Sequence, residues 1–186
     1  MANAKSLIAG HLNGMLGKEI VFRNWEDKTI VAKAPGERTT PPTAPQVKVQ
    51  RNFTQGSQYA KSILLDPDLV AGYKRALRPR QNVYSRALQD FVTPPEVTDI
   101  TIRNYTGQVG DIIEVRAVDD YLVTKVYVEI RAANGDLLEG GVAVLQPKGN
   151  VWNYAATVQN PALAGTRVIA FANDFPGNEA SLEVLL

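Results

Sequence analysis

The chain of 186 residues contains no cysteine and one histidine, His11. Without thiols it can form no disulfide, no thiolate metal site and no cysteine nucleophile. A single histidine in a glycine-containing stretch is a poor basis for a metal centre or a Ser-His-Asp triad, both of which hold histidine rigidly. A phosphate-binding loop, a nucleophile elbow and a dinucleotide fingerprint are also missing. We therefore expect no enzymatic activity, no cofactor and no metal.

Long apolar runs are missing as well. The first 17 residues, MANAKSLIAGHLNGMLG, are too polar and too short for a signal-peptide core or a membrane span. We expect a protein that is made in the cytoplasm without a recognisable signal peptide, has no membrane span, and is either retained there or released as part of a particle. Hydrophobic content of 45% and charged content of 21% are those of a folded soluble chain.

Charge is distributed unevenly although the formal net charge is only +1. Residues 1–92 contain 14 Lys/Arg and 7 Asp/Glu, which gives a net charge of +7. Residues 93–186 contain 6 Lys/Arg and 12 Asp/Glu, which gives a net charge of −6. Such asymmetry indicates either a basic region that binds a partner or attraction between halves of neighbouring copies. Chance distribution over solvated faces explains it equally well.

The N-terminal half predicts a β-hairpin, a linker and short helices. Residues 18–23 and 29–33 are β-rich runs joined by a turn at 24–28, and the proline-rich segment 35–45 predicts an extended linker. A helical stripe of Val49, Phe53, Ala60, Ile63 and Leu64 follows, with Gly56 on the same side. Asp66-Pro67 is expected to begin a second helix, whose inward side chains are Leu69, Tyr73 and Leu77. Asn82 is expected to begin a third helix, whose inward side chains are Val83, Ala87, Leu88 and Phe91.

After Pro94-Pro95 the pattern changes to seven short β-rich runs separated by turn residues. Alternation such as Val126/Val128/Ile130 against Tyr127/Glu129 predicts strands with one buried and one wet face, and Asn134-Gly135 predicts a hairpin turn. The runs are 97–103, 111–118, 123–132, 136–145, 151–158, 167–172 and 180–186. We therefore predict an α+β protein with two domains, a hairpin and helical region at 1–93 and a seven-stranded antiparallel β-sandwich at 94–186.

Several phrases of the second half resemble bacterial immunoglobulin-like modules: residues 117–130 (AVDDYLVTKVYVEI), Trp152-Asn-Tyr154, and residues 168–174 (VIAFAND) with Pro176-Gly-Asn178. This resemblance covers about half the chain and implies an immunoglobulin-like sandwich, a scaffold that hosts many functions. The first half is similar to uncharacterised bacterial proteins that carry a G-x-x-G and V-F-R hairpin before a Gln/Arg-rich helix. The matching positions here are Gly14, Gly17, 21–23, Gln46, Gln50, Arg51, Phe53 and 59–61. That second resemblance implies no activity.

The sequence also contains residues for three other kinds of site. Asp119, Asp120, Asp174 and Asn178 could converge and bind calcium, but capping of their own turns is the preferred interpretation. A basic cluster in the helical region could contact phosphates, although we expect no nucleic acid partner because acidic residues of the sandwich could pair with it. Its members are Lys74, Arg75, Arg78, Arg80 and Arg86, with Tyr73 and Tyr84 interleaved. A carbohydrate site would need exposed aromatic residues, for which the candidates are Tyr121, Tyr127, Trp152 and Tyr154.

Trp25 at the expected hairpin tip is either exposed to contact a partner or folded over the hairpin. We predict a non-enzymatic structural or interaction protein, a subunit of a phage virion or contractile-injection-like particle that docks through its N-terminal half. Its partners would be proteins, in a homo-oligomer or a hetero-assembly, and the alternative is a ligand- or carbohydrate-binding module. The expected partner contacts are Arg23, Trp25, Lys28, Arg51, Arg78, Arg80 and Arg86.

Overall fold

A computed structural model describes residues 2–4, 12–25, 28–37, 40–147 and 149–186. The chain divides into two compact units, Met1–Ala44 and Pro45–Leu186. Within the described residues it is an α+β protein, mostly β, with three helices and three four-stranded antiparallel sheets. The expected boundary between residues 93 and 94 lies inside the second unit, where the last helix gives way to the first strand of the larger β region.

The first unit is a single sheet with strand order β1-β4-β3-β2. Its strands are β1 (Ala2–Ala4), β2 (Gly14–Leu16), β3 (Ile20–Trp25) and β4 (Lys28–Lys33). The predicted hairpin is confirmed as β3 and β4, which pair antiparallel from Ile20↔Lys33 to Trp25↔Lys28. Gly17 and Lys18, both with φ near +60° (59° and 58°), make the turn between β2 and β3.

The second unit begins with three helices, α1 (Ala44–Ile63), α2 (Pro67–Arg75) and α3 (Val83–Val92). Both predicted N-caps are confirmed: the Asp66 carboxylate accepts hydrogen bonds from the N–H groups of Asp68 and Leu69, and the Asn82 side chain accepts one from Ser85. In the proline-rich segment, residues 34–37 and 40–43 have no helix or strand, as an extended linker requires. The predicted linker is two residues too long, because α1 begins at Ala44 and Pro45 lies in its first turn, where a proline is tolerated.

The prediction for the apolar stripe of α1 is wrong for its N-terminal part. Val49 and Phe53 are 69% and 56% exposed, whereas Gly56, Ala60 and Ile63 are buried. Leu64, also predicted on this stripe, comes just after the end of α1 and is 48% exposed. The reason is that α3 covers only the C-terminal part of α1. A Cβ on Gly56 would lie 2.9 Å from Leu88 and 3.0 Å from Phe91, so the glycine permits this close contact.

Eight strands in two sheets form the rest of the unit. The strands are β5 (Glu96–Thr101), β6 (Ile112–Val118), β7 (Val123–Arg131), β8 (Leu137–Val142), β9 (Val144–Leu145), β10 (Val151–Ala155), β11 (Arg167–Asp174) and β12 (Glu179–Leu185). The orders are β5-β6-β10-β9 and β12-β11-β7-β8. Each predicted run forms strand, but the run 136–145 is divided, because the chain leaves one sheet at Val142 and enters the other at Val144.

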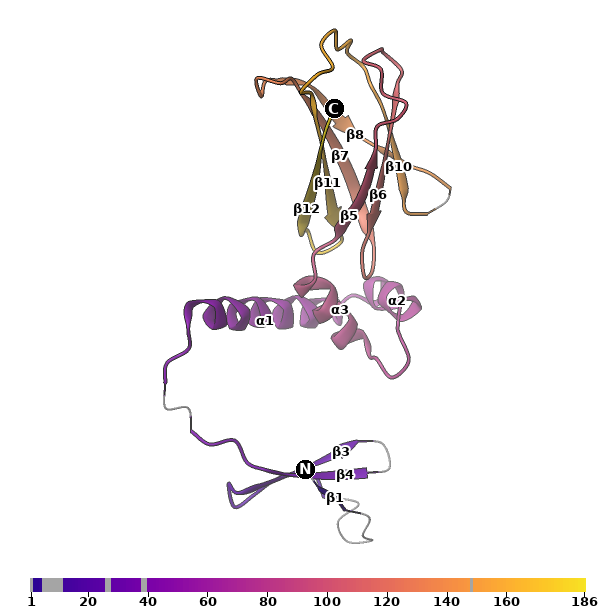
Figure 1. The fold of residues 1–186 in the computed structure, drawn as a ribbon. Helices are drawn as coiled ribbons and strands as arrows, with labels where there is room; N and C mark the ends of the chain where they lie inside the picture. Colours follow the sequence, from indigo (N-terminus) through magenta and orange to yellow (C-terminus); the bar gives the residue numbers. More distant parts are fainter. Residues whose placement is uncertain (1, 5–11, 26–27, 38–39, 148) are drawn as a thin grey trace. The chain divides into compact units, whose positions relative to one another are not determined.

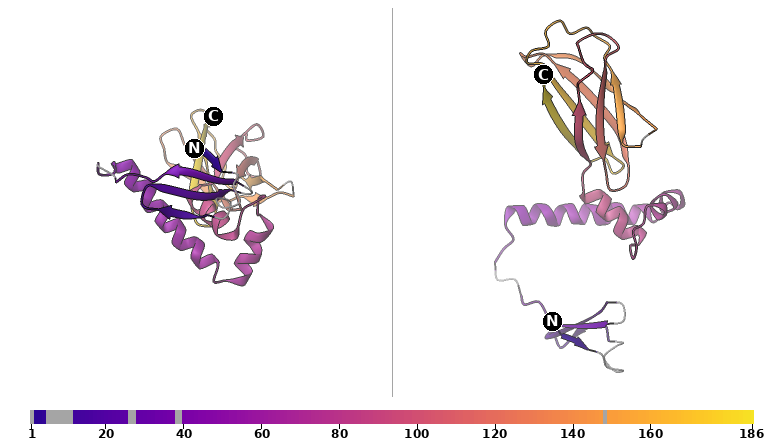
Figure 2. Two further views of the ribbon diagram at one scale, coloured as in Figure 1. Left: turned by 90° about the horizontal axis from the view of Figure 1, so that it is seen from below. Right: turned by 45° about the vertical axis from the view of Figure 1, so that its right-hand side comes forward.

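One hydrophobic core lies between these two sheets. It takes alternate residues from β6 on one side and from β7 and β11 on the other, including Ile113, Val115, Val128, Ile130 and Val168, all with no exposed surface. The three helices lie at the end of the sheets where the β6–β7 and β11–β12 turns are found (Figures 1 and 2). A second cluster joins the helices to that end, since Tyr121 of the β6–β7 turn packs against Tyr73.

Candidate interaction surfaces

The sheet of the first unit carries apolar side chains on both faces. Partners in an antiparallel register share a face. Leu16 lies opposite Ile20 on one face, and Met15 lies opposite Val21 on the other. Leu16 and Met15 are 64% and 60% exposed, and Ile20 is exposed as well.

Few described side chains in this sheet are fully buried, and the apolar ones at its centre are half-buried: Val21, Phe22, Ile30, Val31 and Ala32. Among residues 12–24, 28–37 and 40–44, whose burial is described, only Thr29 and Ala34 are buried. Thr29 is held by a 3.0 Å hydrogen bond to the Asn24 side chain. A sheet of this size needs a covered hydrophobic face to be stable on its own. The described part of the unit contains no second layer that supplies one.

Three of the predicted partner-binding residues lie on this sheet. Arg23 and Lys28 are exposed, on β3 and β4 respectively. Trp25 is the last residue of β3 and lies opposite Lys28 in the register. The Trp25 side chain and residues 26–27 lie outside the described part of the chain, as does His11. The structure therefore brings Trp25 and Lys28 together at one end of the hairpin and leaves the tryptophan prediction open.

A buried chain of hydroxyl and carboxyl groups joins the three helices. The Tyr73 hydroxyl of α2 donates a 2.6 Å hydrogen bond to the carboxylate of Asp90 on α3, and the Tyr59 hydroxyl of α1 lies 2.8 Å from that of Tyr73. Because the Tyr73 proton is used on Asp90, Tyr59 is the donor to Tyr73. Asp90 has no exposed surface, and burial raises its pKa to about 7. Burial also raises the pKa of Tyr73, and that of Tyr59 to about 12.

Two further carboxylates reach this junction from the turns of the sheets. Asp119 accepts hydrogen bonds from the N–H groups of Tyr121 and Leu122 through one oxygen. Its other oxygen and the free oxygen of Asp90 are both buried and lack a hydrogen-bond partner within the described structure. The two side chains are within hydrogen-bonding reach, and this contact, together with the charges of Asp119 and Asp174, adds to the rise in the pKa of Asp90. A single proton on Asp90 would therefore satisfy both oxygens.

The residues considered for calcium are all engaged in contacts within the chain, either in their own turns or with the helices. Asp174 accepts from the N–H groups of Gly177 and Asn178 and from the Asn178 amide, and burial raises its pKa. Asp120 is paired with Arg78 at 2.6 Å. Among the described residues no group of three or more acidic, histidine or cysteine side chains is arranged to hold a metal ion. The turn-capping interpretation therefore holds for Asp119 and Asp174, whereas Asp120 binds Arg78 and Gln89 of the helical region instead.

Part of the basic cluster in the helical region lies next to Asp120, in the turn between β6 and β7. Arg78 binds Asp120, and Arg86 reaches within 3.9 Å of the same carboxylate. Arg86 is only 3% exposed and is not accessible to a partner. Arg80 is exposed and has a positive φ of 65°. The expectation that acidic residues of the second half pair with this cluster is confirmed for Arg78.

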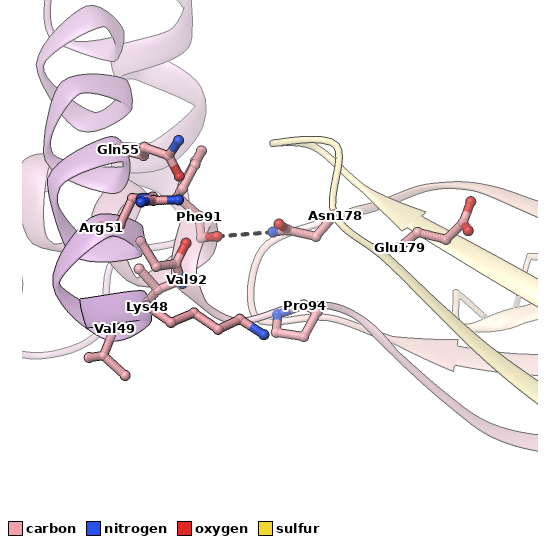
Figure 3. Close-up of a pocket in the computed structure, with 10 residues that line it drawn as sticks. Lys48, Val49, Arg51, Gln55, Phe91, Val92, Pro94, Asn178 and Glu179 are labelled. Carbon is pink, nitrogen blue, oxygen red and sulfur yellow. Dashed lines mark hydrogen bonds between the residues drawn. The ribbon is translucent and has the colours of Figure 1, made fainter. Parts of the chain in front are cut away.

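A groove of about 620 Å³ runs between α1 and the junction of α3 with the sheets (Figure 3). Phe91, Val92 and Pro94 contribute apolar surface, and Lys48 and Arg51 of α1 add positive charge. The Asn178 amide donates a 3.1 Å hydrogen bond to the Phe91 carbonyl and ties the β11–β12 turn to α3. The predicted residue Arg51 therefore lies in this groove.

The aromatic candidates for a ligand site are mostly internal. Trp152 and Tyr154 belong to the core, and Tyr121 is half-buried and stacks on Tyr73 with ring centroids 4.2 Å apart. Tyr127 lies on the outer face of its sheet, opposite Phe171 in the register. These two rings line a shallow hollow of about 330 Å³ together with Lys125, Glu129, Asn173 and Glu179.

The described helices include none that is long and apolar enough to cross a bilayer. Comparison with known proteins yields no match, whether to models of protein families, to curated proteins or to solved structures.

Sequence reasoning missed the buried Asp90. A signal for it exists, because Val83, Ala87 and Asp90 are spaced four and three residues apart and so share one face of α3. An acidic residue on an otherwise apolar face indicates a buried polar network.

Proposed function

We propose that this chain is a non-enzymatic subunit of a larger protein assembly, of the kind found in phage virions or contractile injection particles. Residues 1–44 would dock onto a neighbouring subunit, of the same or another chain. The observation that carries the proposal is the sheet of the first unit, whose apolar side chains are half-buried or exposed on both faces among the residues with described burial. A neighbour would supply the missing second layer, much as subunits of obligate oligomers complete each other's cores.

Cross-strand pairs in this sheet suggest where the contact lies. Leu16 and Ile20 present apolar surface on one face and Met15 on the other, next to the exposed charges of Arg23 and Lys28. An apolar centre with a charged rim is the composition of a specific protein interface. Arg23 and Lys28 remain the proposed rim contacts in this unit.

The fold proposed for the second unit is immunoglobulin-like. The order β5-β6-β10-β9 corresponds to the A-B-E-D sheet of that fold, and β12-β11-β7 corresponds to G-F-C with β8 added at the edge. This correspondence supports the resemblance in residues 117–130 and 168–178. Such a unit would be the displayed part of the subunit, and it carries no function by itself.

Charge substitution in the first sheet tests the docking. We expect Leu16→Lys combined with Ile20→Lys to abolish assembly, measured as molar mass by light scattering after size exclusion or as capture of the natural partner. Leu65→Lys is the matched control, because Leu65 is 85% exposed outside the sheet. Assembly that survives the double substitution would overturn the proposal.

A ligand-binding module is the second candidate, favoured by the hollow around Tyr127 and Phe171. Two half-buried rings beside Glu129 and Asn173 are the combination that stacks against and hydrogen-bonds a sugar. Titration with oligosaccharides, followed by tyrosine fluorescence, tests it. Binding that is lost in Tyr127→Ala supports this candidate, and the absence of any response removes it.

A further inference from the structure

The helices and the sheets of the second unit are built around two separate hydrophobic clusters. Among the described residues, the cluster between the sheets contains no helix residue, and the helical cluster contains one residue from the turns of the sheets, Tyr121. Tyr121 stacks on Tyr73 of α2, and Phe175 of the β11–β12 turn meets the Tyr73 ring edge-on with centroids 6.2 Å apart. The helices can therefore separate from these turns while the core between the sheets stays intact.

Polar contacts also join the helices to the β6–β7 and β11–β12 turns. Asp120 accepts hydrogen bonds from Arg78 at 2.6 Å and from the Gln89 amide at 2.7 Å. The Asn178 amide donates to the Phe91 carbonyl at 3.1 Å. Each of these bonds pairs a donor with an acceptor.

At the centre of the same boundary two carboxyl groups meet. One oxygen of Asp90 on α3 and one of Asp119 in the β6–β7 turn are buried and lack a hydrogen-bond partner within the described structure, and the two side chains are within hydrogen-bonding reach. Two charged carboxylates repel each other and offer no donor, whereas a carboxyl that keeps its proton donates to the other. The contact between Asp90 and Asp119 therefore requires one proton.

The groups around Asp90 supply no compensating positive charge. The titratable and charged groups near it are Tyr59 of α1, Tyr73 of α2, Arg86 of α3 itself, Asp119 of the β6–β7 turn and Asp174 of the β11–β12 turn. Tyr73 donates to the other oxygen of Asp90, and Asp174 adds a further negative charge. Arg86 approaches Asp120 at 3.9 Å, and its buried Nε and Nη1 atoms form no hydrogen bond to Asp90.

We propose that this boundary is a pH-sensitive contact: a proton held between Asp90 and Asp119 keeps α1–α3 on the turns, and loss of that proton releases the helices while the sheets stay folded. Release exposes both carboxylates to water, which relieves their repulsion. In chain order the helices connect residues 1–44 to the sheets, so release would loosen the link between the two units.

The pH range of the release follows from the two states of Asp90. Burial raises its pKa to about 7 in the closed form, and exposure in the open form returns the pKa to its ordinary value of 3.8. Between these values the closed form binds a proton that the open form has lost. The ratio of open to closed molecules therefore rises by up to about tenfold per pH unit and levels off above about pH 7.

Limited trypsin digestion at pH 8 tests whether the release is local. Exposed cleavage sites lie in the helical region at Lys61 and Lys74, and in the sheet region at Arg103 and Lys125. Asp90→Asn supplies a donor without a charge, so cleavage at the helical sites should be at least about tenfold slower than in the natural chain, while cleavage at the sheet sites is unchanged. Asp99→Asn, at an exposed carboxylate of β5, is the control and should change neither rate.

The pH profile separates this role from a purely structural one. After correction for the intrinsic exchange rate, amide protection of α2 and α3 in the natural chain should fall by up to about tenfold per unit from pH 5 to pH 7 and stay constant above. In Asp90→Asn it should be flat. Asp120→Asn, which removes the charge that pairs with Arg78, should lower the protection by the same factor at every pH.

Asp119→Asn approaches the contact from the other side and keeps the test informative if Asp90→Asn does not fold. Its amide keeps an oxygen for the N–H groups of Tyr121 and Leu122 and presents a donor to Asp90. Cleavage at the helical sites should therefore be slowed at pH 8 in this variant too.

Helical sites that are cleaved as fast in both amide variants as in the natural chain would disprove the proposal. Equal slowing at helical and sheet sites would disprove it as well, because the proton would then act on the whole unit. Both measurements concern the second unit alone, so neither result bears on the docking of residues 1–44.

Discussion

Asp90 shows how one buried side chain can link stability to pH. Its carboxyl has no exposed surface, accepts a hydrogen bond from Tyr73 and lies within hydrogen-bonding reach of Asp119. Burial and the neighbouring carboxylates raise the pKa from the usual 3.8 to about 7, so the folded chain holds a proton that the unfolded chain has lost.

The sign of the pH effect follows from that difference. Between about pH 4 and pH 7 the folded state binds more protons than the unfolded state, so this group's contribution to the free energy of unfolding falls as pH rises and is constant above about 7. Asp174, whose pKa is also raised by burial, acts in the same direction.

We predict that Asp90→Asn is stabilised relative to the natural chain as pH rises. The amide keeps an acceptor for Tyr73 and supplies a donor toward Asp119 without a charge. Between pH 5 and pH 8 the stability difference should shift in favour of the variant by about 2 kcal/mol, measured by urea unfolding. Asp99→Asn, at an exposed carboxylate, is the control. A difference that does not change with pH contradicts this assignment.

Gly56 is the second residue with a large expected effect. Its missing side chain admits Leu88 and Phe91 of α3 to the surface of α1. We predict that Gly56→Leu lowers the free energy of unfolding by about 1–3 kcal/mol through overpacking, whereas Gln58→Leu, at an exposed position on the same helix, leaves it nearly unchanged. Equal unfolding midpoints for the two variants would contradict the contact between the helices.

At the scale of elements, helix starts depend on local signals. The Asn82 side chain accepts a 2.7 Å hydrogen bond from the Ser85 N–H and begins α3. We predict that Asn82→Ala costs about 1 kcal/mol of stability in thermal or urea unfolding. Ser85→Ala keeps the backbone donor and should have little effect. An Asn82→Ala variant as stable as Ser85→Ala would show that the cap contributes nothing.

Elements were predictable where the determining signal is local. Alternation in 126–130, the Asn134-Gly135 turn and the caps at Asp66 and Asn82 each act within a few residues, and each was predicted correctly. The division of run 136–145 was not predicted, because the crossing at Ala143 depends on its backbone contact with Val126 of a different strand. The short edge strands β1 and β2 also escaped prediction, since they exist through pairing with β4 and β3.

The candidate surfaces were predictable only in part, for the same reason. Helical spacing placed Val49 and Phe53 with Ala60 and Ile63, but burial depends on whether another element covers that length of helix. The sequence alone shows that Arg78 and Arg86 are positively charged, but it does not show what surrounds them. Whether each residue meets solvent or Asp120 depends on how the helices meet the sheets.

At the scale of the whole molecule the two units differ in self-sufficiency. The second unit encloses one core between two sheets and a second cluster at the helices. The first unit, in the residues whose burial is described, buries only Thr29 and Ala34. Its other described apolar side chains are half-buried or exposed, and such partial burial gains too little free energy to offset the entropy of ordering the sheet. We therefore propose that a neighbour stabilises residues 1–44.

Amide hydrogen exchange, followed with molar mass over a range of protein concentrations, tests this claim most directly. The account predicts that β3 and β4 are protected only in proportion to the oligomer present, or only after the natural partner is added, while β7 and β11 stay protected at every concentration. A monomeric chain in which β3 and β4 exchange as slowly as β7 and β11 would contradict it.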